Sequence, residues 1–229
     1  VCDEDGFVLN ESGLAGRSWR EYVDMIVFIN DYAMARNSQL YLHDNSNHHR
    51  RRWGAEASEE YQIAPIVNLA SGGHGGGWRR SWRRDYAKFA VRYAAYLWDP
   101  ALRRIEDPDG VVSVTGPQEL WWRRFCRTKD AGDRRTVVVQ VIRTPRPRIP
   151  QDQWNDPERH RRRPPIEGID VEVAQGDGYR LRALWCATAE PEVTQQKLDA
   201  TVRKGKVHAK LPPLHNWHMV VAEFERSSP

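Results

Sequence analysis

Polar side chains follow three apolar runs in the first third of the chain, and these residues are the ones best suited to chemistry. Asn10 and Glu11 follow GFVL, the triplet His43, Asp44 and Asn45 follows QLYL, and His74 follows IAPIVNLAS within the stretch SGGHGGGW. If the three runs are neighbouring parallel strands, their carboxyl ends meet at one edge of a sheet, where parallel α/β folds carry their functional groups. The pattern therefore predicts one site built from all six residues.

Glu11 is the residue of this set that could move a proton. A carboxyl group at the end of a buried strand is partly desolvated, which raises its pKa and keeps it protonated near neutral pH. Such a group can donate a proton to a departing oxygen atom as a general acid. The alternative interpretation is a helix-capping or surface carboxylate, because Gly13 and Gly16 follow closely.

The glycine-rich stretch does not fit a phosphate-binding loop, since it lacks the lysine and the hydroxyl residue of G-x-x-x-x-G-K-[ST]. A metal site could use His43, Asp44, His48 and His49, but three arginines follow His49 directly and disfavour a cation there. His74 could equally bond a loop carbonyl and have no further role. We expect no metal and no cofactor.

The elements that would position these residues alternate between strand and helix. Strands are expected over 5–12, 39–45 and 63–71, with a short helical piece over 55–61. One helix should begin at Ser18, which forms an S-x-x-E capping box with Glu21 and is followed by apolar residues at helical spacing. Another should begin at Ser81 and bury Trp82, Tyr86, Phe89, Tyr93 and Leu97. Short connections between such elements predict a parallel sheet with crossover helices.

After residue 108 the pattern changes to short strand-like runs separated by turn residues, which predicts an antiparallel β-sandwich. The expected strands are VVSVT, ELWWRRF, RTVVVQVIRT, GIDVEV, GYRLRALWC, KGKVHAKLP and NWHMVVAEF. The proline-rich, charged stretch 143–165 reads as a long surface loop. The predicted fold class is therefore α/β followed by all-β, with domains at 1–107 and 108–229.

Charge and cysteine content limit the other function classes. The net charge of +4 comes from an arginine-biased composition, with basic runs at 48–53, 78–84 and 158–165. Arginine beside tryptophan can bind nucleic acid, but no nucleic-acid-binding motif accompanies these runs, and a solvated basic face explains them as well. Three cysteines exclude a disulfide framework. Cys126 and Cys186 could form one bridge or remain buried thiols.

No apolar run is long enough to span a bilayer, so we expect no membrane partner. The chain begins with Val and carries no signal-peptide pattern, so we expect a processed or partial chain.

The order of the elements and the residues of one block resemble the glycoside hydrolase family of dextranases and cycloisomaltooligosaccharide glucanotransferases. In that family the last barrel strand runs into an A-S/A-G-G-x-H loop, and an aromatic "YYDF…AY" helix follows. The corresponding residues here are LASGGH at 69–74 and DYAKFAVRYAAY at 85–96. The family combines a (β/α)8 TIM barrel with a C-terminal β-sandwich. The resemblance implies that this chain is the last part of such an enzyme.

The resemblance also implies a chemistry and a set of partners. Glu11 matches the general acid/base at the end of the sixth barrel strand, although LNESG lacks the tryptophan of the family's T-E-V/L-W context. The nucleophilic aspartate would precede this chain, so the chain alone should be inactive and should need the missing part of the barrel or a second chain. The substrate would be an α-glucan oligo- or polysaccharide cleaved with retention.

Under the same resemblance, Asn10, His43, Asp44, Asn45 and His74 would bond sugar hydroxyls. Trp78 would stack on a sugar ring or, alternatively, pack against the helix after it. An extracellular or periplasmic location is expected.

Two other function classes remain open from the sequence. One is a non-catalytic carbohydrate-binding or surface protein of the same architecture, and the other is an Arg/Trp-rich nucleic-acid-binding module. Neither explains why polar residues follow three successive strands.

Overall fold

A computed structural model describes residues 7–10, 18–36, 39–42, 59–75, 81–146 and 163–227, with the backbone alone described for 7–10, 39–42, 59–62, 75 and 81–84. The chain groups into two compact units. The first comprises Val1–Ala90 and Pro145–Pro164, and the second comprises Val91–Thr144 and Pro165–Pro229. No helix in the described part has the length and apolar character needed to cross a bilayer.

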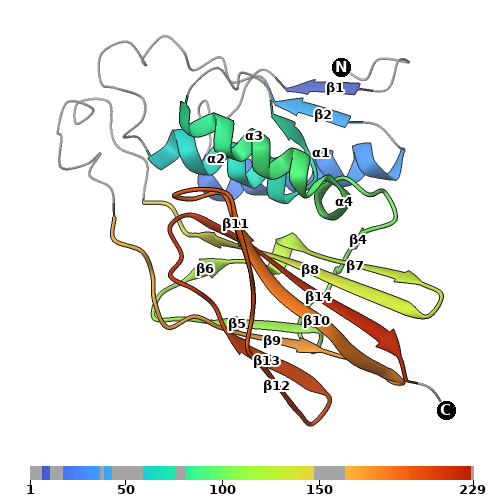
Figure 1. Cartoon of the computed structure of the whole chain (residues 1–229). Coiled ribbons are helices and arrows are strands. Elements are labelled where there is room, and N and C mark those ends of the chain that lie inside the picture. Colours follow the sequence, from blue (N-terminus) through green and yellow to red (C-terminus); the bar gives the residue numbers. More distant parts are fainter. Residues whose placement is uncertain are drawn as a thin grey trace. The chain divides into compact units, whose positions relative to one another are not determined.

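The first unit alternates strands and helices, as Figure 1 shows. Its strands pair in parallel in the order β1-β2-β3, which confirms the predicted parallel pairing for the first two strands. The elements are β1 (Phe7–Asn10), α1 (Trp19–Ala35), β2 (Gln39–Leu42), α2 (Glu59–Ala70), β3 (His74–Gly75) and the start of α3 (Ser81–Arg92).

Helix α1 begins where the sequence predicts. The Ser18 hydroxyl accepts a hydrogen bond from the Glu21 backbone N–H at 3.3 Å, and the Ser18 backbone N–H donates to Glu21 Oε2 at 2.7 Å. These reciprocal bonds satisfy donors that a helix start leaves without partners. One side of the helix is buried, with Tyr22 and Ile26 fully inaccessible. The capping box is therefore confirmed.

The expectation of a strand over 63–71 is wrong, because these residues form most of helix α2. Ile63, Ile66, Val67 and Leu69 are all fully buried, and the half-buried Ala64 and Pro65 between them are apolar as well, so the run shows no alternation. An apolar run without alternation does not distinguish a buried strand from a buried helix. The third strand is instead β3, which lies directly after this helix and contains His74.

The second unit begins in the last turn of α3, continues through α4 (Ala94–Leu97), and then consists of antiparallel strands in two sheets. The larger sheet has the order β11-β10-β14-β8-β7-β4 with β6 beside β8, and the smaller has the order β12-β13-β9-β5. The strands of the larger sheet are β4 (Arg103–Arg104), β6 (Leu120–Trp121), β7 (Cys126–Ala131), β8 (Arg134–Arg143), β10 (Tyr179–Thr188), β11 (Thr194–Lys197) and β14 (Trp217–Arg226). Those of the smaller are β5 (Val112–Thr115), β9 (Asp170–Ala174), β12 (Ala200–Arg203) and β13 (Lys206–Lys210).

The core of this unit lies between the two sheets. Alternate residues of β8, among them Val137, Val139 and Val141, pack in one buried cluster with Val171 and Val207 of the smaller sheet. Side chains of a strand alternate between its two faces, so each sheet contributes one face to this core. The predicted antiparallel sandwich is therefore confirmed.

Cys126 and Cys186 are free, buried thiols in this core. Cys126 lies on β7 and Cys186 on β10, with β8 and β14 between them. Three strand spacings separate them by roughly 14 Å, which is well beyond the reach of a disulfide. Of the two alternatives from the sequence, buried thiols are the correct one.

Candidate functional site

The carboxyl ends of the three parallel strands of the first unit form one edge. Asn10, Leu42 and Gly75, the last residues of β1, β2 and β3, occupy the same level in the register. The residues that follow β1 and β2 in sequence are therefore attached at neighbouring points of this edge. His74 lies one level earlier, paired with Tyr41.

Most of the predicted site residues lie outside the part of the chain that the structure describes. This holds for Glu11, His43, Asp44, Asn45 and Trp78. Asn10 is described by its backbone alone, as the end of β1. His74 is the predicted site residue whose side-chain environment the structure describes.

His74 is half-buried at the start of β3. Burial lowers the pKa of its imidazole below the usual 6.5, because desolvation disfavours the charged form. The ring is therefore neutral at pH 7, with one nitrogen that donates and one that accepts. A neutral imidazole of this kind suits a ligand hydroxyl group, which also donates and accepts.

The backbone at His74 is held by a buried polar cluster that the sequence interpretation missed. Asn68 Nδ2 donates to the His74 carbonyl oxygen at 2.7 Å. Asn30 Nδ2 of α1 donates to Asn68 Oδ1 at 3.1 Å and to Ser71 Oγ at 2.6 Å. Asn30 and Asn68 are 1% and 0% exposed, respectively, so these bonds form away from water, where losing one is costly. The cluster ties α1, α2 and β3 together.

This cluster had a detectable signal in the sequence. Asn30 is a polar residue on the otherwise apolar inner side of α1, which carries Tyr22, Ile26 and Ala33. A buried amide needs partners, and Asn68 and Ser71 flank LA in NLAS at the end of the next apolar run. The wrong strand assignment for 63–71 hid this pairing.

The first two glycines of the glycine-rich stretch have local structural roles. Gly72 has a φ of 94°, a conformation that favours glycine and ends helix α2. Gly73 lies so close to the cluster that a Cβ atom there would overlap Asn68 Oδ1 and come within 2.7 Å of both amide atoms of Asn30. These two glycines allow a tight turn between the end of α2 at Ala70 and the start of β3 at His74.

The described residues hold no cluster of three or more His, Cys, Asp or Glu side chains that could bind a metal ion. The described residues therefore form a strand edge whose last strand, β3, is held by buried hydrogen bonds and carries a neutral histidine. Such an edge can bind and orient a hydroxylated ligand.

Two solved structures to which this chain is similar are enzymes whose names refer to carbohydrates. A cycloisomaltooligosaccharide glucanotransferase from Paenibacillus sp., solved in complex with cycloisomaltoheptaose, matches 70% of this chain at a TM-score of 0.50 and 17% sequence identity. The α-L-fucosidase isoenzyme 2 of Paenibacillus thiaminolyticus matches 52% of the chain at a TM-score of 0.31 and 13% identity.

The chain spans 26% of the glucanotransferase and 16% of the fucosidase. The first likeness is one of fold, and the second is too weak to carry an argument. No protein-family model matches the sequence, and no curated protein matches it either.

Proposed function

We propose that this chain belongs to a carbohydrate-active glycoside hydrolase, retaining in mechanism and acting on an α-glucan such as dextran, of which it forms the C-terminal part. The observation that carries the proposal is the likeness over 70% of the chain to a glucanotransferase solved with a cyclic oligosaccharide. A shared fold alone does not define a ligand class, because functions belong to sites that differ between proteins of one fold.

The topology of the first unit supports a barrel origin. Consecutive strands β1, β2 and β3 are also neighbours in the sheet. Because crossover connections are right-handed, this order puts α1 and α2 on the same side, and a hydrogen bond of 3.1 Å from Tyr22 Oη to the Ala64 carbonyl oxygen joins the two helices. Helices on one side only are typical of a (β/α)8 barrel, whereas doubly wound sheets carry them on both faces.

We assign the strand–helix part of residues 1–107 to the last βα units of such a barrel, and residues 108–229, together with β4 of the larger sheet, to its β-sandwich domain. Three strands cannot close a barrel of eight. The remaining units would come from elsewhere in the same polypeptide or from a second chain, and so would the nucleophilic aspartate.

In this proposal Glu11 is the general acid/base. It protonates the departing glycosidic oxygen while the aspartate attacks the anomeric carbon, and it then deprotonates the water or sugar hydroxyl that releases the product. Asn10, His43, Asp44, Asn45 and His74 bind sugar hydroxyls along the strand edge, and Trp78 stacks on a sugar ring. The neutral state of the His74 imidazole fits this role.

The test is release of reducing sugar from a panel of α- and β-glucans by the native polypeptide that contains this sequence. Glu11→Gln should lower the rate by about 10²-fold or more, the usual scale for a general acid, with the far-UV circular dichroism spectrum unchanged. Glu106→Gln is the matched control, because Glu106 is an exposed carboxylate of the second unit, and it should leave the rate unchanged.

Two results would change the proposal. Activity that survives Glu11→Gln would put the acid at another residue. No cleavage of any glycan, together with retardation in dextran-containing gels, would favour the non-catalytic carbohydrate-binding protein. We also propose an extracellular or periplasmic location, where polymeric glucans are encountered, and export of the native polypeptide from its source cells tests it.

A further inference from the structure

Two buried hydrogen bonds connect helix α1 to His74 through the side chain of Asn68. Asn30 Nδ2 of α1 donates to Asn68 Oδ1 at 3.1 Å, and Asn68 Nδ2 of α2 donates to the His74 carbonyl oxygen at 2.7 Å. Both ends of the Asn68 amide are therefore engaged, one as acceptor and the other as donor, which fixes its orientation. His74 is the first residue of β3, so the two amides determine where this strand begins.

The amide of Asn30 has one orientation that satisfies its neighbours. Its Nδ2 atom lies 3.1 Å from Asn68 Oδ1, 3.2 Å from the Asn68 carbonyl oxygen and 2.6 Å from Ser71 Oγ. The Ser71 hydroxyl donates to the carbonyl oxygens of Val67 and Asn68, at 2.7 Å and 3.0 Å, so it accepts from Asn30. An amide turned the other way would place its oxygen against the two oxygens of Asn68, which cannot donate.

This orientation has a cost at the other end of the same amide. Asn30 Oδ1 is buried and accepts no hydrogen bond from the part of the chain that the structure describes, and the residue is 1% exposed. A buried acceptor without a partner lowers stability, whereas an apolar side chain carries no such penalty. Stability alone therefore does not account for an asparagine here. The feature that does account for it is the donor, which holds Asn68.

Asn68 also contacts the backbone just before His74. A Cβ atom at Gly73 would lie 2.1 Å from Asn68 Oδ1, so the amide packs directly against the glycine. The His74 backbone is thus bonded at its own carbonyl and packed at the preceding residue. Its imidazole is half-buried. A group that must meet a ligand in one geometry loses much of its effect when it is displaced by about 1 Å.

We propose that Asn68 and Asn30 are positioning residues, which act through His74 and place its imidazole for the hydroxyl group of a bound sugar. Asn68 acts on the His74 backbone directly, and Asn30 acts by orienting Asn68. Neither side chain contacts the ligand, because both are buried. This inference rests on the proposed carbohydrate function, and it names the residues that control how tightly His74 binds.

The first measurement follows His74 itself and needs no sugar. Hydrogen–deuterium exchange at the imidazole C2 position, resolved by mass spectrometry, reports the pKa and the exposure of each histidine in the native polypeptide. Asn68→Ala should raise the pKa of His74 towards 6.5 and speed its exchange, because the released backbone no longer keeps the ring half-buried. The control Tyr22→Phe removes a different hydrogen bond between α1 and α2, that of 3.1 Å to the Ala64 carbonyl oxygen, and should leave His74 unchanged.

A second variant keeps this measurement decisive if the cavity left by Asn68→Ala prevents folding. It combines Asn68→Ala with Gly73→Ala. The methyl group added at residue 73 would lie 2.1 Å from the place that Asn68 Oδ1 occupies, so it refills part of the space. It supplies no donor for the His74 carbonyl, and the same change at the His74 imidazole is therefore expected.

The second measurement takes kcat and KM for dextran from initial rates of the native polypeptide. Asn68→Ala and His74→Ala should each raise KM by up to about 10-fold, the equivalent of one neutral hydrogen bond, while kcat stays nearly constant because the contact is one of binding. The double variant should be no worse than His74→Ala alone, since Asn68 acts through His74. Tyr22→Phe should leave both constants unchanged.

The two measurements separate the possible failures. Unchanged exchange at His74 in both Asn68 variants would overturn the positioning role at any level of activity. Changed exchange with additive losses in KM would overturn the step from the position of His74 to ligand binding. Changed exchange in a polypeptide that neither binds nor cleaves dextran would sustain the positioning of His74 and reject the proposed function, together with sugar as the ligand.

Discussion

Gly73 shows how closely one residue of the strand edge is fitted to its surroundings. Its Cα faces the buried amides of Asn30 and Asn68, which leave no room for a side chain. Asn68 in turn holds the His74 carbonyl. The position of the His74 backbone therefore depends on residue 73 having no side chain.

Gly73→Ala should destabilise the first unit by about 1–3 kcal/mol, the usual range for overpacking a buried site. The control is Gly110→Ala, where φ is 93° but no atom lies within 4 Å of the added Cβ. That change should cost about 1 kcal/mol from backbone strain alone. Guanidinium unfolding curves followed by tryptophan fluorescence measure both variants. Equal losses would mean that the cluster relaxes around the added methyl group.

His218 is a buried titratable residue of the second unit. It is 1% exposed on β14, and its Nδ1 atom has no hydrogen-bond partner in the part of the chain that the structure describes. Burial is the main cause that lowers its pKa to about 4, with the nearby His215 adding to the effect. The folded protein therefore holds this imidazole neutral.

Stability should fall as the pH is lowered from about 6.5 towards 4. In this window the unfolded chain binds a proton at His218 and the folded chain does not, so acid favours unfolding. The total loss from this residue is on the order of 3 kcal/mol. Urea unfolding at pH 7 and pH 5 should show the slope, and His218→Gln should reduce it, since an amide does not titrate. A slope unaffected by His218→Gln would assign the acid sensitivity to another group.

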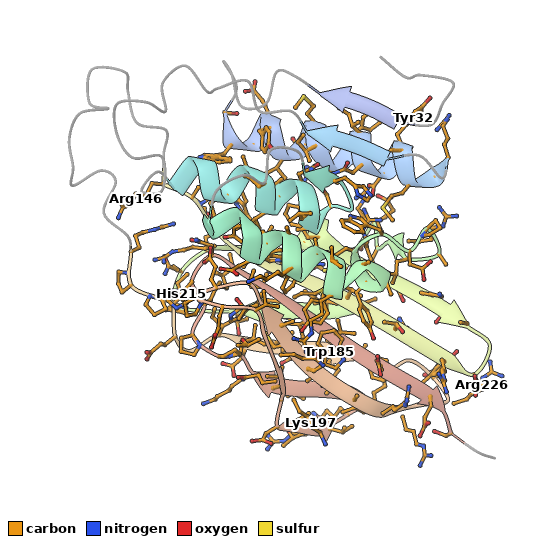
Figure 2. All side chains as sticks on the ribbon, turned by 45° about the horizontal axis from the view of Figure 1, so that its top comes forward. Tyr32, Arg146, Trp185, Lys197, His215 and Arg226 are labelled. Carbon is orange, nitrogen blue, oxygen red and sulfur yellow. The ribbon has the colours of Figure 1, made fainter. Side chains whose placement is uncertain are left out.

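At the scale of elements, α4 is held against the larger sheet of the second unit by two tyrosines. Tyr96 Oη donates to Glu223 Oε1 of β14 at 2.8 Å, and Tyr93 Oη donates to Gln195 Oε1 of β11 at 3.2 Å. Both rings contact Trp185, with centroids 5.0 Å and 5.8 Å away, and Figure 2 shows Trp185 on this sheet. Burial and the Glu223 carboxylate raise the pKa of Tyr96 to about 12.

The two hydrogen bonds offer a matched comparison. Tyr96→Phe should cost about 1–2 kcal/mol, because its bond is to a charged partner, and Tyr93→Phe should cost about 0.5–1 kcal/mol, because its partner is neutral. A double-mutant cycle of Tyr96→Phe with Glu223→Gln, measured by chemical unfolding, isolates the contribution of the Glu223 charge to the first bond, because the glutamine amide oxygen still accepts a hydrogen bond. If Tyr93→Phe costs as much as Tyr96→Phe, the charge of Glu223 contributes nothing.

Elements could be predicted where local signals were strong. The Ser18 capping box marked the start of α1, and the β-branched run RTVVVQVIRT indicated β8. Four strands had no such signal: β4 has two residues, β7 begins CRTKD, β11 reads TQQK and is exposed throughout, and β12 has one half-buried residue. Helix α2 was mistaken for a strand because the run IAPIVNLA is apolar at nearly every position, and such a run is compatible with either a buried strand or a buried helix.

At the scale of the whole molecule, the class of each half followed from the sequence, but the strand order did not. Strand β8 pairs with β14, about eighty residues later in the chain, and β10 lies between β11 and β14. Such long-range pairing depends on which faces become buried together, and no local pattern records it. The same is true of the buried cluster, which joins residues 30 and 68 across two helices.

The two core thiols can report how often the sandwich opens. Burial raises the pKa of both Cys126 and Cys186, so neither presents a reactive thiolate while the two sheets remain together. An alkylating reagent can modify them only in molecules that have opened. Because one thiol is on β7 and the other on β10, their separate labelling rates report whether the two sides of the larger sheet open together or one at a time.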